Sequence, residues 1–252
     1  MSKAKTSIIW FRRDLRINDH PALLAAIESS EQIIPLFILD KQQIKEAGSK
    51  LLAYMGQSLR LLDESLGNKL HIIEGDQVEV LSTLIKKYEV QEVHISDEYE
   101  RFGAARDARV EAAGIKLVRT GSPYAVTPGR VVKPSDGTPY KVYTPFYKAW
   151  CAHGWRAPAV TPKKFNCVEP TVEYRAFPNF PMPEGVEVIH AGEAAALKRF
   201  KEFTKNGLDS YDENRNFASI DGTSKMSTYL TVSYTHPPSP RDRTRSRMPS
   251  SA

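Results

Sequence analysis

The chain has 252 residues, of which 41% are hydrophobic and 26% charged, and this composition indicates a globular protein with one large or two small domains. The N-terminus shows no signal-peptide pattern, and no run approaches the roughly 18 apolar residues of a membrane span, so we expect no membrane association. The net charge of +5 includes +3 from the last 21 residues, which hold four arginines and one aspartate, so charge alone does not identify a nucleic-acid-binding protein.

Apolar runs alternate with helical patterns over the first 120 residues. Buried strands are predicted at residues 7–11, 33–39, 70–73, 93–95 and 115–118. Helices are predicted at residues 21–29, 51–66, 78–88 and 102–113, the first N-capped by Asp19 and the last ended by Gly114. Strands joined by such helices pair in parallel through right-handed crossovers. The predicted fold is therefore α/β, a doubly wound parallel sheet of five strands.

The segments that follow the first, second and fourth predicted strands are candidate ligand sites, because such a sheet binds ligands beyond the carboxyl ends of its strands. They are residues 12–18, 40–43 and 97–101. Neither GxGxxG nor GxxxxGK[ST] occurs, which excludes the usual dinucleotide and P-loop sites. The sequence has no metal-ligand spacing, and its two cysteines, Cys151 and Cys167, indicate reduced thiols of a cytoplasmic protein.

A proline-rich stretch with little periodicity begins near residue 155. We expect it to form an ordered linker that wraps the α/β domain, anchored by its aromatic residues Phe165, Tyr174, Phe177 and Phe180. After this stretch, residues 194–203 predict one clear helix.

The last residues, 232–252, have the composition of a disordered basic tail. One allowed back-translation of them, however, contains pieces of the synthetic adapters used in sequencing libraries, in their usual order. We therefore interpret residues 232–252 as a non-native tail that truncates the gene, and we assign them no function.

Three arginines surround an aspartate directly after the first strand: Arg12, Arg13, Asp14 and Arg16. At the end of a strand, such a cluster can grip an anionic or planar ligand. The same residues are equally compatible with a network of ion pairs that only stabilises the fold. From the residues alone, both interpretations stay open.

A second candidate site lies between Tyr211 and Ser227. Thr223, Ser224 and Ser227 offer hydroxyl groups where a helix is expected to begin, and this arrangement suits a phosphate group. An ordinary helix N-capped by Thr223 or Ser224 is the alternative.

Several long segments, in order, resemble the photolyase/cryptochrome family, in particular class I cyclobutane pyrimidine dimer photolyases. They are residues 10–23 (WFRRDLRINDHPAL), 97–107, 137–150 (GTPYKVYTPFYKAW) and 211–227, and the resemblance covers about residues 7–230. In residues 137–150 the turn residues and the aromatics at helix-like spacing lead us to expect a segment that docks the linker onto the sheet.

The resemblance implies a domain order. Residues 1–130 would form a Rossmann-like antenna domain, residues 131–190 an inter-domain linker, and residues 191–231 the start of an all-α FAD-binding domain. Most of that domain would follow Leu230, so we expect a truncated chain that holds FAD poorly and lacks the residues that act in catalysis.

Individual roles also follow from the resemblance. Tyr211 would contact the flavin and Arg215 would contact DNA near the lesion. The FAD diphosphate would be held by Thr223, Ser224, Lys225, Met226 and Ser227. Two of these depart from the commoner pattern: Lys225 stands where Arg or Gly is usual and keeps a charge without a guanidinium fork, and Met226 replaces Leu.

The antenna pigment would lie near Arg12, Arg13, Asp14, Arg16, Asp40, Asp97 and Arg106. The Asn–Glu pair that some folate-binding members carry falls on Phe102 and Gly103, which weakens a folate assignment. A deazaflavin, a flavin, a folate or no antenna stays open.

The function implied is light-driven repair of cyclobutane pyrimidine dimers by electron transfer from reduced FAD, the reaction of a deoxyribodipyrimidine photo-lyase. The expected partner is UV-damaged DNA, and the expected state is a monomer. A cryptochrome photoreceptor without repair activity and a stand-alone pigment- or nucleotide-binding α/β module are the alternatives.

Overall fold

A computed structural model describes residues 4–185 and 189–230. The predicted tail at 232–252 lies outside these described residues. The chain divides into two compact units, residues 1–35 with 77–168 and residues 36–76 with 169–252. The domain boundaries predicted after residues 130 and 190 do not coincide with these units, and they stay predictions.

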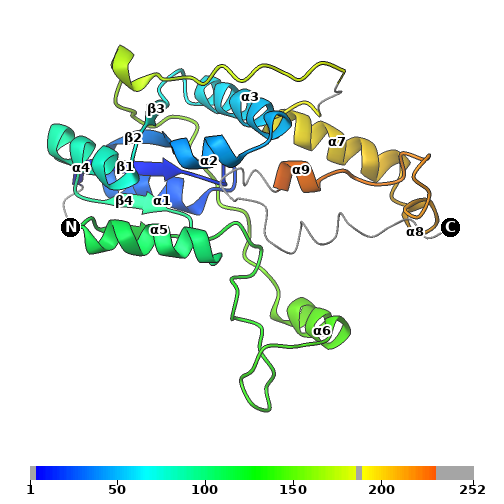
Figure 1. The fold of residues 1–252 in the computed structure, drawn as a ribbon. Helices are drawn as coiled ribbons and strands as arrows, with labels where there is room; N and C mark the ends of the chain where they lie inside the picture. Colours follow the sequence, from blue (N-terminus) through cyan, green and yellow to red (C-terminus); the bar gives the residue numbers. More distant parts are fainter. Residues whose placement is uncertain (1–3, 186–188, 231–252) are drawn as a thin grey trace. The chain divides into compact units, whose positions relative to one another are not determined.

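Five strands form one sheet in the order β3-β2-β1-β4-β5 (Figure 1). They are β1 (Ala4–Phe11), β2 (Ser30–Leu39), β3 (His71–Glu74), β4 (Val93–Ile95) and β5 (Leu117–Arg119). β1 pairs in parallel with β4, β2 with β3, and β4 with β5. The strand order reverses direction between β1 and β4, and this confirms the predicted doubly wound parallel sheet.

In the first unit, β1 is a central strand with an unbroken buried run, Thr6–Phe11. Helix α1 (Pro21–Ser29) packs against β1 and β4 and buries Ala22, Leu23 and Ala26. Helices α4 (Gln77–Tyr88) and α5 (Arg101–Ala112) contact each other. Gly114, just past α5, has φ 82°, the left-handed conformation that commonly ends helices.

The N-cap of α1 is His20, so the prediction of Asp19 is wrong. The Nδ1 atom of His20 accepts a hydrogen bond from the Leu23 amide at 3.1 Å, as a capping side-chain oxygen would. Asp19 is used elsewhere: its carboxylate accepts from Arg156 at 2.6 Å and from the Ala159 amide at 2.8 Å. These bonds tie the start of the linker to the loop after β1.

In the second unit, α3 (Ser49–Ser65) carries the apolar stripe that the sequence predicted. Met55, Leu59 and Leu62 are buried at helical spacing. A short helix that was not predicted, α2 (Lys41–Glu46), precedes it and buries none of its residues.

Two segments of the proline-rich stretch pair with strands of the sheet, and its role as an inter-domain linker stays a prediction. In the first unit, Ile33 of β2 exchanges backbone hydrogen bonds with Asn166 and Val168. In the second unit, Arg175 follows the 3-10 helix η1 (Val172–Tyr174) and forms a bridge to Ile72 of β3. Arg175 also holds the Asp63 carboxylate with two nitrogens, at 3.2 and 2.8 Å. The predicted anchor Phe180 packs its ring near Gly56 of α3.

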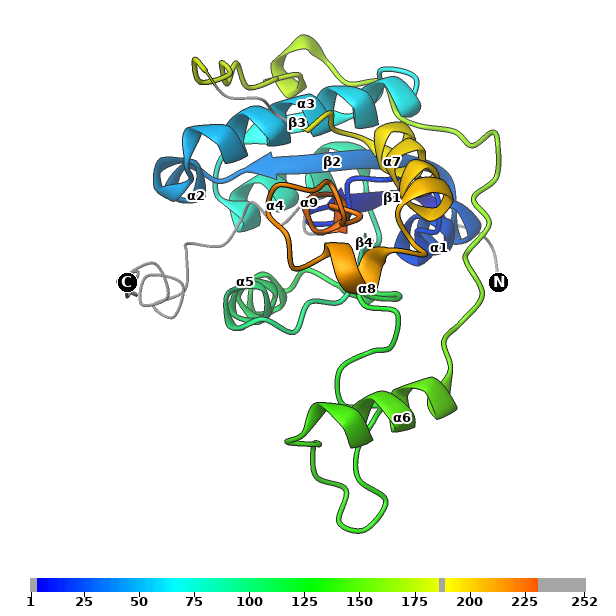
Figure 2. The ribbon, with the colours of Figure 1, turned by 90° about the vertical axis from the view of Figure 1, so that its right-hand side faces the viewer.

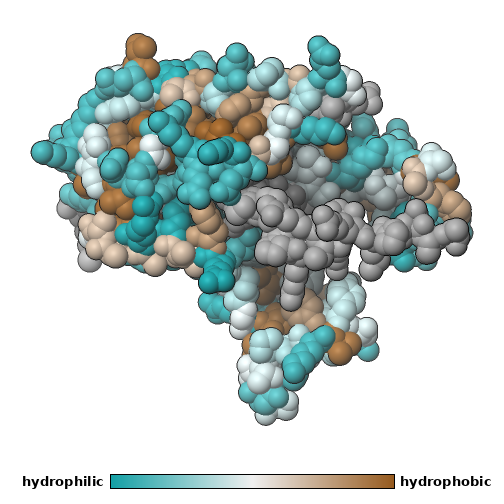
Figure 3. Space-filling view, in the orientation of Figure 1, coloured by the Kyte–Doolittle hydropathy of each residue, from teal (hydrophilic) through white to brown (hydrophobic). Residues whose placement is uncertain are grey.

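Helix α6 (Tyr143–His153) does not dock the linker onto the sheet, so that expectation is wrong. None of its residues is buried, and Tyr143 is 72% exposed. Its aromatic rings stack on local partners instead, Tyr143 on Tyr147 and Trp150 on Trp155. Figure 3 shows a few hydrophobic residues among polar ones in the region of α6, the helix at the bottom of Figure 1.

After the linker, the second unit contains α7 (Glu193–Asn206), which confirms the helix predicted at 194–203. It is followed by two single-turn helices, α8 (Tyr211–Asn214) and α9 (Ser227–Leu230). Across residues 4–185 and 189–230, no helix is both long and apolar enough to cross a membrane.

Candidate functional sites

The loop between α8 and α9, residues 215–226, folds back toward α7 (Figure 2). Gly222 is buried against α8, and a Cβ atom there would lie 2.5 Å from the Asn214 Cβ and 2.9 Å from the Asn214 carbonyl oxygen. A side chain at this position would push the loop off α8, so glycine fixes the close approach of the two segments.

Two cations surround one carboxylate in this loop. Asp221 pairs with Lys225 at 2.9 Å and with Arg199 of α7 at 2.8 Å. The hydrogen bonds from Lys225 and Arg199 hold the pKa of Asp221 below its ordinary value. Because Asp221 stays ionised beside two positive charges, the local net charge is positive and favours an anionic group.

The predicted phosphate-binding residues lie together around these charges. Thr223 and Ser224 are half-buried, and the Ser224 hydroxyl accepts a hydrogen bond from the Met226 amide at 3.3 Å. Lys225 has φ 55°, a left-handed conformation that is uncommon outside glycine. Hydroxyl groups that can donate hydrogen bonds and a net positive charge both suit a phosphate group. These residues therefore have the chemistry that the predicted diphosphate-binding role requires, and that role stays a prediction.

The side chains of Tyr211, the first residue of α8, and Arg215, the residue directly after α8, lie side by side. The Arg215 guanidinium sits 5.6 Å from the centre of the Tyr211 ring, and Phe203 of α7 meets the same ring edge-on. Arg215 also lies 3.4 Å from the Asp212 carboxylate. Both side chains are part exposed, Tyr211 by 39%, so they can still contact a ligand.

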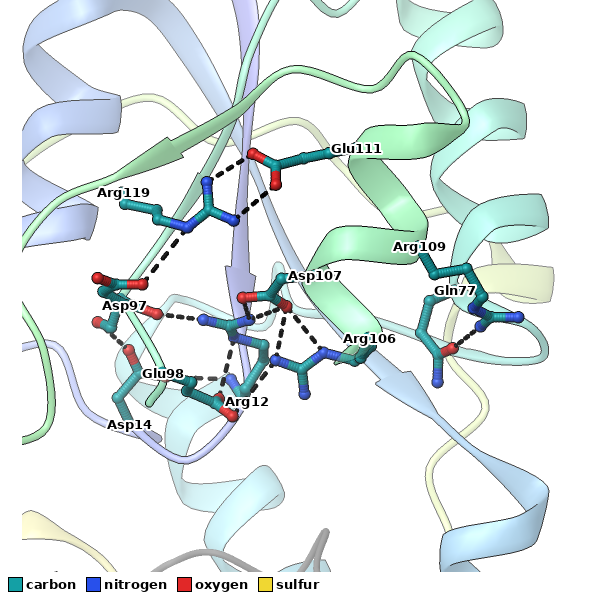
Figure 4. A network of polar contacts seen from close by, with 11 residues as sticks. Arg12, Asp14, Gln77, Asp97, Glu98, Arg106, Asp107, Arg109, Glu111 and Arg119 are labelled. Atoms are coloured by element: carbon teal, nitrogen blue, oxygen red, sulfur yellow. Dashed lines mark hydrogen bonds and ion pairs between the residues drawn. The ribbon is translucent and has the colours of Figure 1, made fainter. Parts of the chain in front are cut away.

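In the first unit, Arg12 lies inside a buried ionic network at the ends of β1 and β4 (Figure 4). Its Nη1 donates to both Asp107 carboxylate oxygens, at 2.7 and 2.9 Å, and its Nε lies 3.3 Å from Glu98. Its Nη2 donates to the Ser96 carbonyl, so all three nitrogens face protein acceptors. The Arg12 side chain is 2% exposed.

Asp14 is also buried, and it binds to protein groups on several sides. Its carboxylate accepts from the Arg12 amide at 3.0 Å and from the Ser96 hydroxyl, and it lies 2.9 Å from Nε2 of His20. Burial raises the pKa of Asp14, but His20, Ser96 and the Arg12 amide outweigh that effect and hold it well below the ordinary value.

Arg106 completes the network with two bonds to Asp107, at 3.0 and 2.9 Å, and a 3.4 Å contact with Glu98. Burial, then the charge of Arg12, lowers the pKa of Arg106 despite these carboxylates. The Arg106 and Arg12 guanidiniums lie 5.0 and 5.3 Å from the Trp10 ring.

Gly103 makes room for this network. A Cβ at position 103 would meet the Glu98 Cβ at 3.0 Å and its Cδ at 3.2 Å, with a carboxylate oxygen closer still. The glycine that departs from the folate-type pattern therefore has a steric reason in this chain.

The other predicted antenna residues are less deeply buried. Arg13 pairs with Glu100 at 2.7 Å, Asp97 lies 3.4 Å from Arg119, and Arg16 donates to the backbone carbonyls of 18 and 19. Asp40 belongs to the second unit and caps α2 by accepting from the amides of residues 42 and 43. The antenna role of all these residues stays a prediction.

Sequence reasoning missed four of the residues that build these sites: Glu98, Asp107, His20 and Arg199. A signal existed for the two acids, because buried arginines at a strand end require carboxylate partners. No local signal identified Arg199, whose partners lie more than 20 residues further along the chain. Within the described part of the chain, no cluster of three or more His, Cys, Asp or Glu side chains could hold a metal ion.

Comparison with known proteins extends these observations. Residues 7–164 match the family DNA photolyase. The chain is 33% identical over 243 residues to a deoxyribodipyrimidine photo-lyase of Alkalihalophilus pseudofirmus, covering 88% of this chain and 50% of that protein. It is also 28% identical to an uncharacterised 31.6 kDa protein of Synechococcus sp. (strain PCC 6716), covering 88% of this chain and 83% of that protein.

The fold matches a crystal structure of a bacterial class III photolyase from Agrobacterium tumefaciens, with a TM-score of 0.73 and 26% identity. This match covers 93% of the present chain and 51% of that structure. The chain spans about half the length of the deoxyribodipyrimidine photo-lyases that it matches. Since the family match extends over more than half of its residues, the chain belongs to the DNA photolyase family.

Proposed function

We propose that this chain is the front part of a light-driven DNA repair enzyme, a deoxyribodipyrimidine photo-lyase that splits cyclobutane pyrimidine dimers. The main support is the loop from Asp221 to Ser227, where hydroxyl groups and a net positive charge gather at the positions expected to hold the FAD diphosphate. The names of the relatives support the same reaction.

Several residues of the second unit would bind the cofactor, each at a different group. Thr223, Ser224 and Ser227 would donate hydroxyl hydrogen bonds to the diphosphate, Lys225 and Met226 would complete the loop, and Tyr211 would contact the flavin. When bound, reduced and light-excited FAD supplies the electron that splits the cyclobutane ring.

Arg215 would contact the DNA beside the lesion. Its guanidinium is half-exposed and is held at the Tyr211 ring and the Asp212 carboxylate, which limits its movement. A positioned arginine can bond a phosphate oxygen with two nitrogens. The pyrimidine dimer would leave the base stack to reach the flavin, at less cost than a sound base pair would require.

An antenna pigment, a deazaflavin, flavin or folate, would bind in the α/β part. The deep burial of Arg12, Asp14 and Arg106 suits the structural interpretation of these three, which would shape the strand ends beneath a pigment. The more exposed Arg13, Arg16 and Asp97 of the first unit would then be the residues available to it. A cytoplasmic monomer remains our prediction.

A stand-alone pigment- or nucleotide-binding module is the second candidate. One observation favours it: the chain covers 83% of the uncharacterised 31.6 kDa relative, which is therefore a protein of similar length. A cryptochrome photoreceptor shares the same scaffold and differs in lacking repair.

The test begins with sequencing of the source gene past the codon of Leu230, followed by expression of the protein that the gene encodes. We expect FAD to co-purify and dimers in an irradiated oligonucleotide to disappear under blue light but not in the dark. An FAD-loaded protein without repair would favour the cryptochrome, and a genuine gene that ends at Ala252 would favour the stand-alone module.

A further inference from the structure

Arg199 of α7 makes more polar contacts to the candidate diphosphate loop than any residue assigned to that loop by resemblance. Its Nη1 and Nη2 hold the two Asp221 carboxylate oxygens at 3.0 and 2.8 Å. Nη2 also donates to the Thr223 carbonyl at 2.6 Å, and Nε donates to the Ser224 carbonyl at 3.1 Å. One planar guanidinium thus holds three residues of the loop: the Asp221 side chain and the backbone carbonyls of Thr223 and Ser224.

These contacts determine the direction of two peptide groups. In a planar trans peptide, the N–H points away from the C=O of the same unit, and no cis peptide occurs among the described residues. When Arg199 binds the carbonyls of Thr223 and Ser224, the amides of Ser224 and Lys225 must point to the opposite side. The two amides are therefore presented together, away from α7.

Two adjacent amides that point the same way form the start of an anion-binding nest. Lys225 adopts the left-handed conformation, φ 55°, that such nests use, and a lysine does so only where surrounding contacts hold it. Two ion pairs provide these contacts: Asp221 holds the Lys225 ammonium, and Arg199 holds Asp221 in turn.

We infer that Arg199 is a positioning residue for the diphosphate loop, which turns the amides of Ser224 and Lys225 outward as donors to an anion. This inference rests on the proposed FAD function of the loop. Arg199 itself would not touch the anion, because its bonds go to Asp221 and to the two carbonyls, and its side chain is only 22% exposed.

The geometry distinguishes a positioning role from a simple charge effect. Lysine at position 199 would keep the positive charge, but a single ammonium cannot bond the carboxylate and both carbonyls in the same fork. If orientation matters, Arg199→Lys resembles Arg199→Met. If only charge matters, Arg199→Lys resembles the wild type.

The experiment uses the complete 252-residue chain and its Arg199→Met and Arg199→Lys variants, with Lys201→Met as the control. Lys201 lies on the same helix and is exposed, so its loss removes a charge from α7 without touching the loop. The amide chemical shifts of Ser224 and Lys225 are measured first without ligand and then during titration with inorganic diphosphate.

We expect both Arg199 variants to shift the ligand-free amide resonances of Ser224 and Lys225 and to lose the diphosphate response, while Lys201→Met matches the wild type. Unchanged ligand-free resonances in Arg199→Met would overturn the inference, as would a normal diphosphate response in Arg199→Lys. A wild-type chain whose Ser224 and Lys225 amides ignore diphosphate would contradict the proposed function of the loop, while the ligand-free spectra would still decide whether Arg199 orders it.

Discussion

At the scale of single residues, two helical glycines differ in what surrounds them. Gly103 of α5 faces the buried Glu98 side chain, whereas a Cβ at Gly56 of α3 would meet the Phe180 ring at 3.6 Å, an ordinary contact. Alanine is favoured over glycine in a helix by about 1 kcal/mol. Glu98 cannot easily move aside, because both of its oxygens lie near buried arginines.

We therefore predict opposite effects for the same substitution. Gly56→Ala should stabilise the protein by up to about 1 kcal/mol, and Gly103→Ala should destabilise it by about 2 kcal/mol through overpacking and disturbed ion pairs. Urea unfolding of both variants against the wild type measures the difference. Equal effects in the two variants would mean that Glu98 has room to relax.

Asp14 gives the protein a predictable response to acid. Its folded pKa lies below the ordinary value of about 4, so the unfolded chain takes up a proton first as the pH falls. The stability that ionised Asp14 contributes is present above that ordinary value and is lost progressively as the pH falls below it.

Asp14→Asn should cost about 2 kcal/mol at neutral pH, since it removes an ionised acceptor of the Arg12 amide and the Ser96 hydroxyl. The difference from the wild type should shrink as the pH is lowered, because the wild type then loses the same contribution. Urea midpoints between neutral pH and about pH 2 test this, with the exposed Asp209→Asn as control. A constant difference across that range would contradict it.

At the scale of elements, the sequence predicted correctly those helices and strands in which the regularly spaced apolar residues are buried. The stripe that includes Met55, Leu59 and Leu62 is buried in α3, so its periodicity identified a real core face. Helix α2 buries no residue and is defined by the Asp40 cap, so its six residues carried no stripe to detect. The aromatics of α6 are spaced as in a helix, but spacing does not tell which surface they meet.

The candidate sites were only partly predictable for a related reason. The phosphate-type loop and the arginine cluster are contiguous in sequence, so motif reasoning found them. The residues that support these sites are distant in sequence. Arg12 pairs with Asp107, 95 residues away, and Arg199 bonds Asp221, which lies 22 residues further along the chain. Such pairings follow from the strand order and from helix packing, which no single segment encodes.

At the scale of the whole molecule, each unit has one region in which several exposed apolar side chains lie close together in the sequence. In the first unit these are on and beside α6, with Val142, Tyr143, Tyr147, Trp155 and Val160 between 49% and 82% exposed. In the second unit they lie on α7 and the segment after it, at Leu197, Phe200, Leu208, Phe217 and Ile220. Contiguous apolar surface of this kind usually marks an interaction site.

An 11-residue helix without buried residues gains little from tertiary packing, and isolated helices shorter than about 12 residues are marginal in water. We predict that replacing Tyr143 and Tyr147 together by serine changes the free energy of unfolding by no more than about 0.5 kcal/mol. The same double variant should bind less of a fluorescent apolar dye and should self-associate less, because it removes two stacked and exposed rings.

Leu59→Ala is the matched control: Leu59 is fully buried, so its truncation should cost about 2–5 kcal/mol. If the tyrosine variant were destabilised as much as Leu59→Ala, α6 would be packed against the core of its unit, and its aromatic face would not be the surface that drives association.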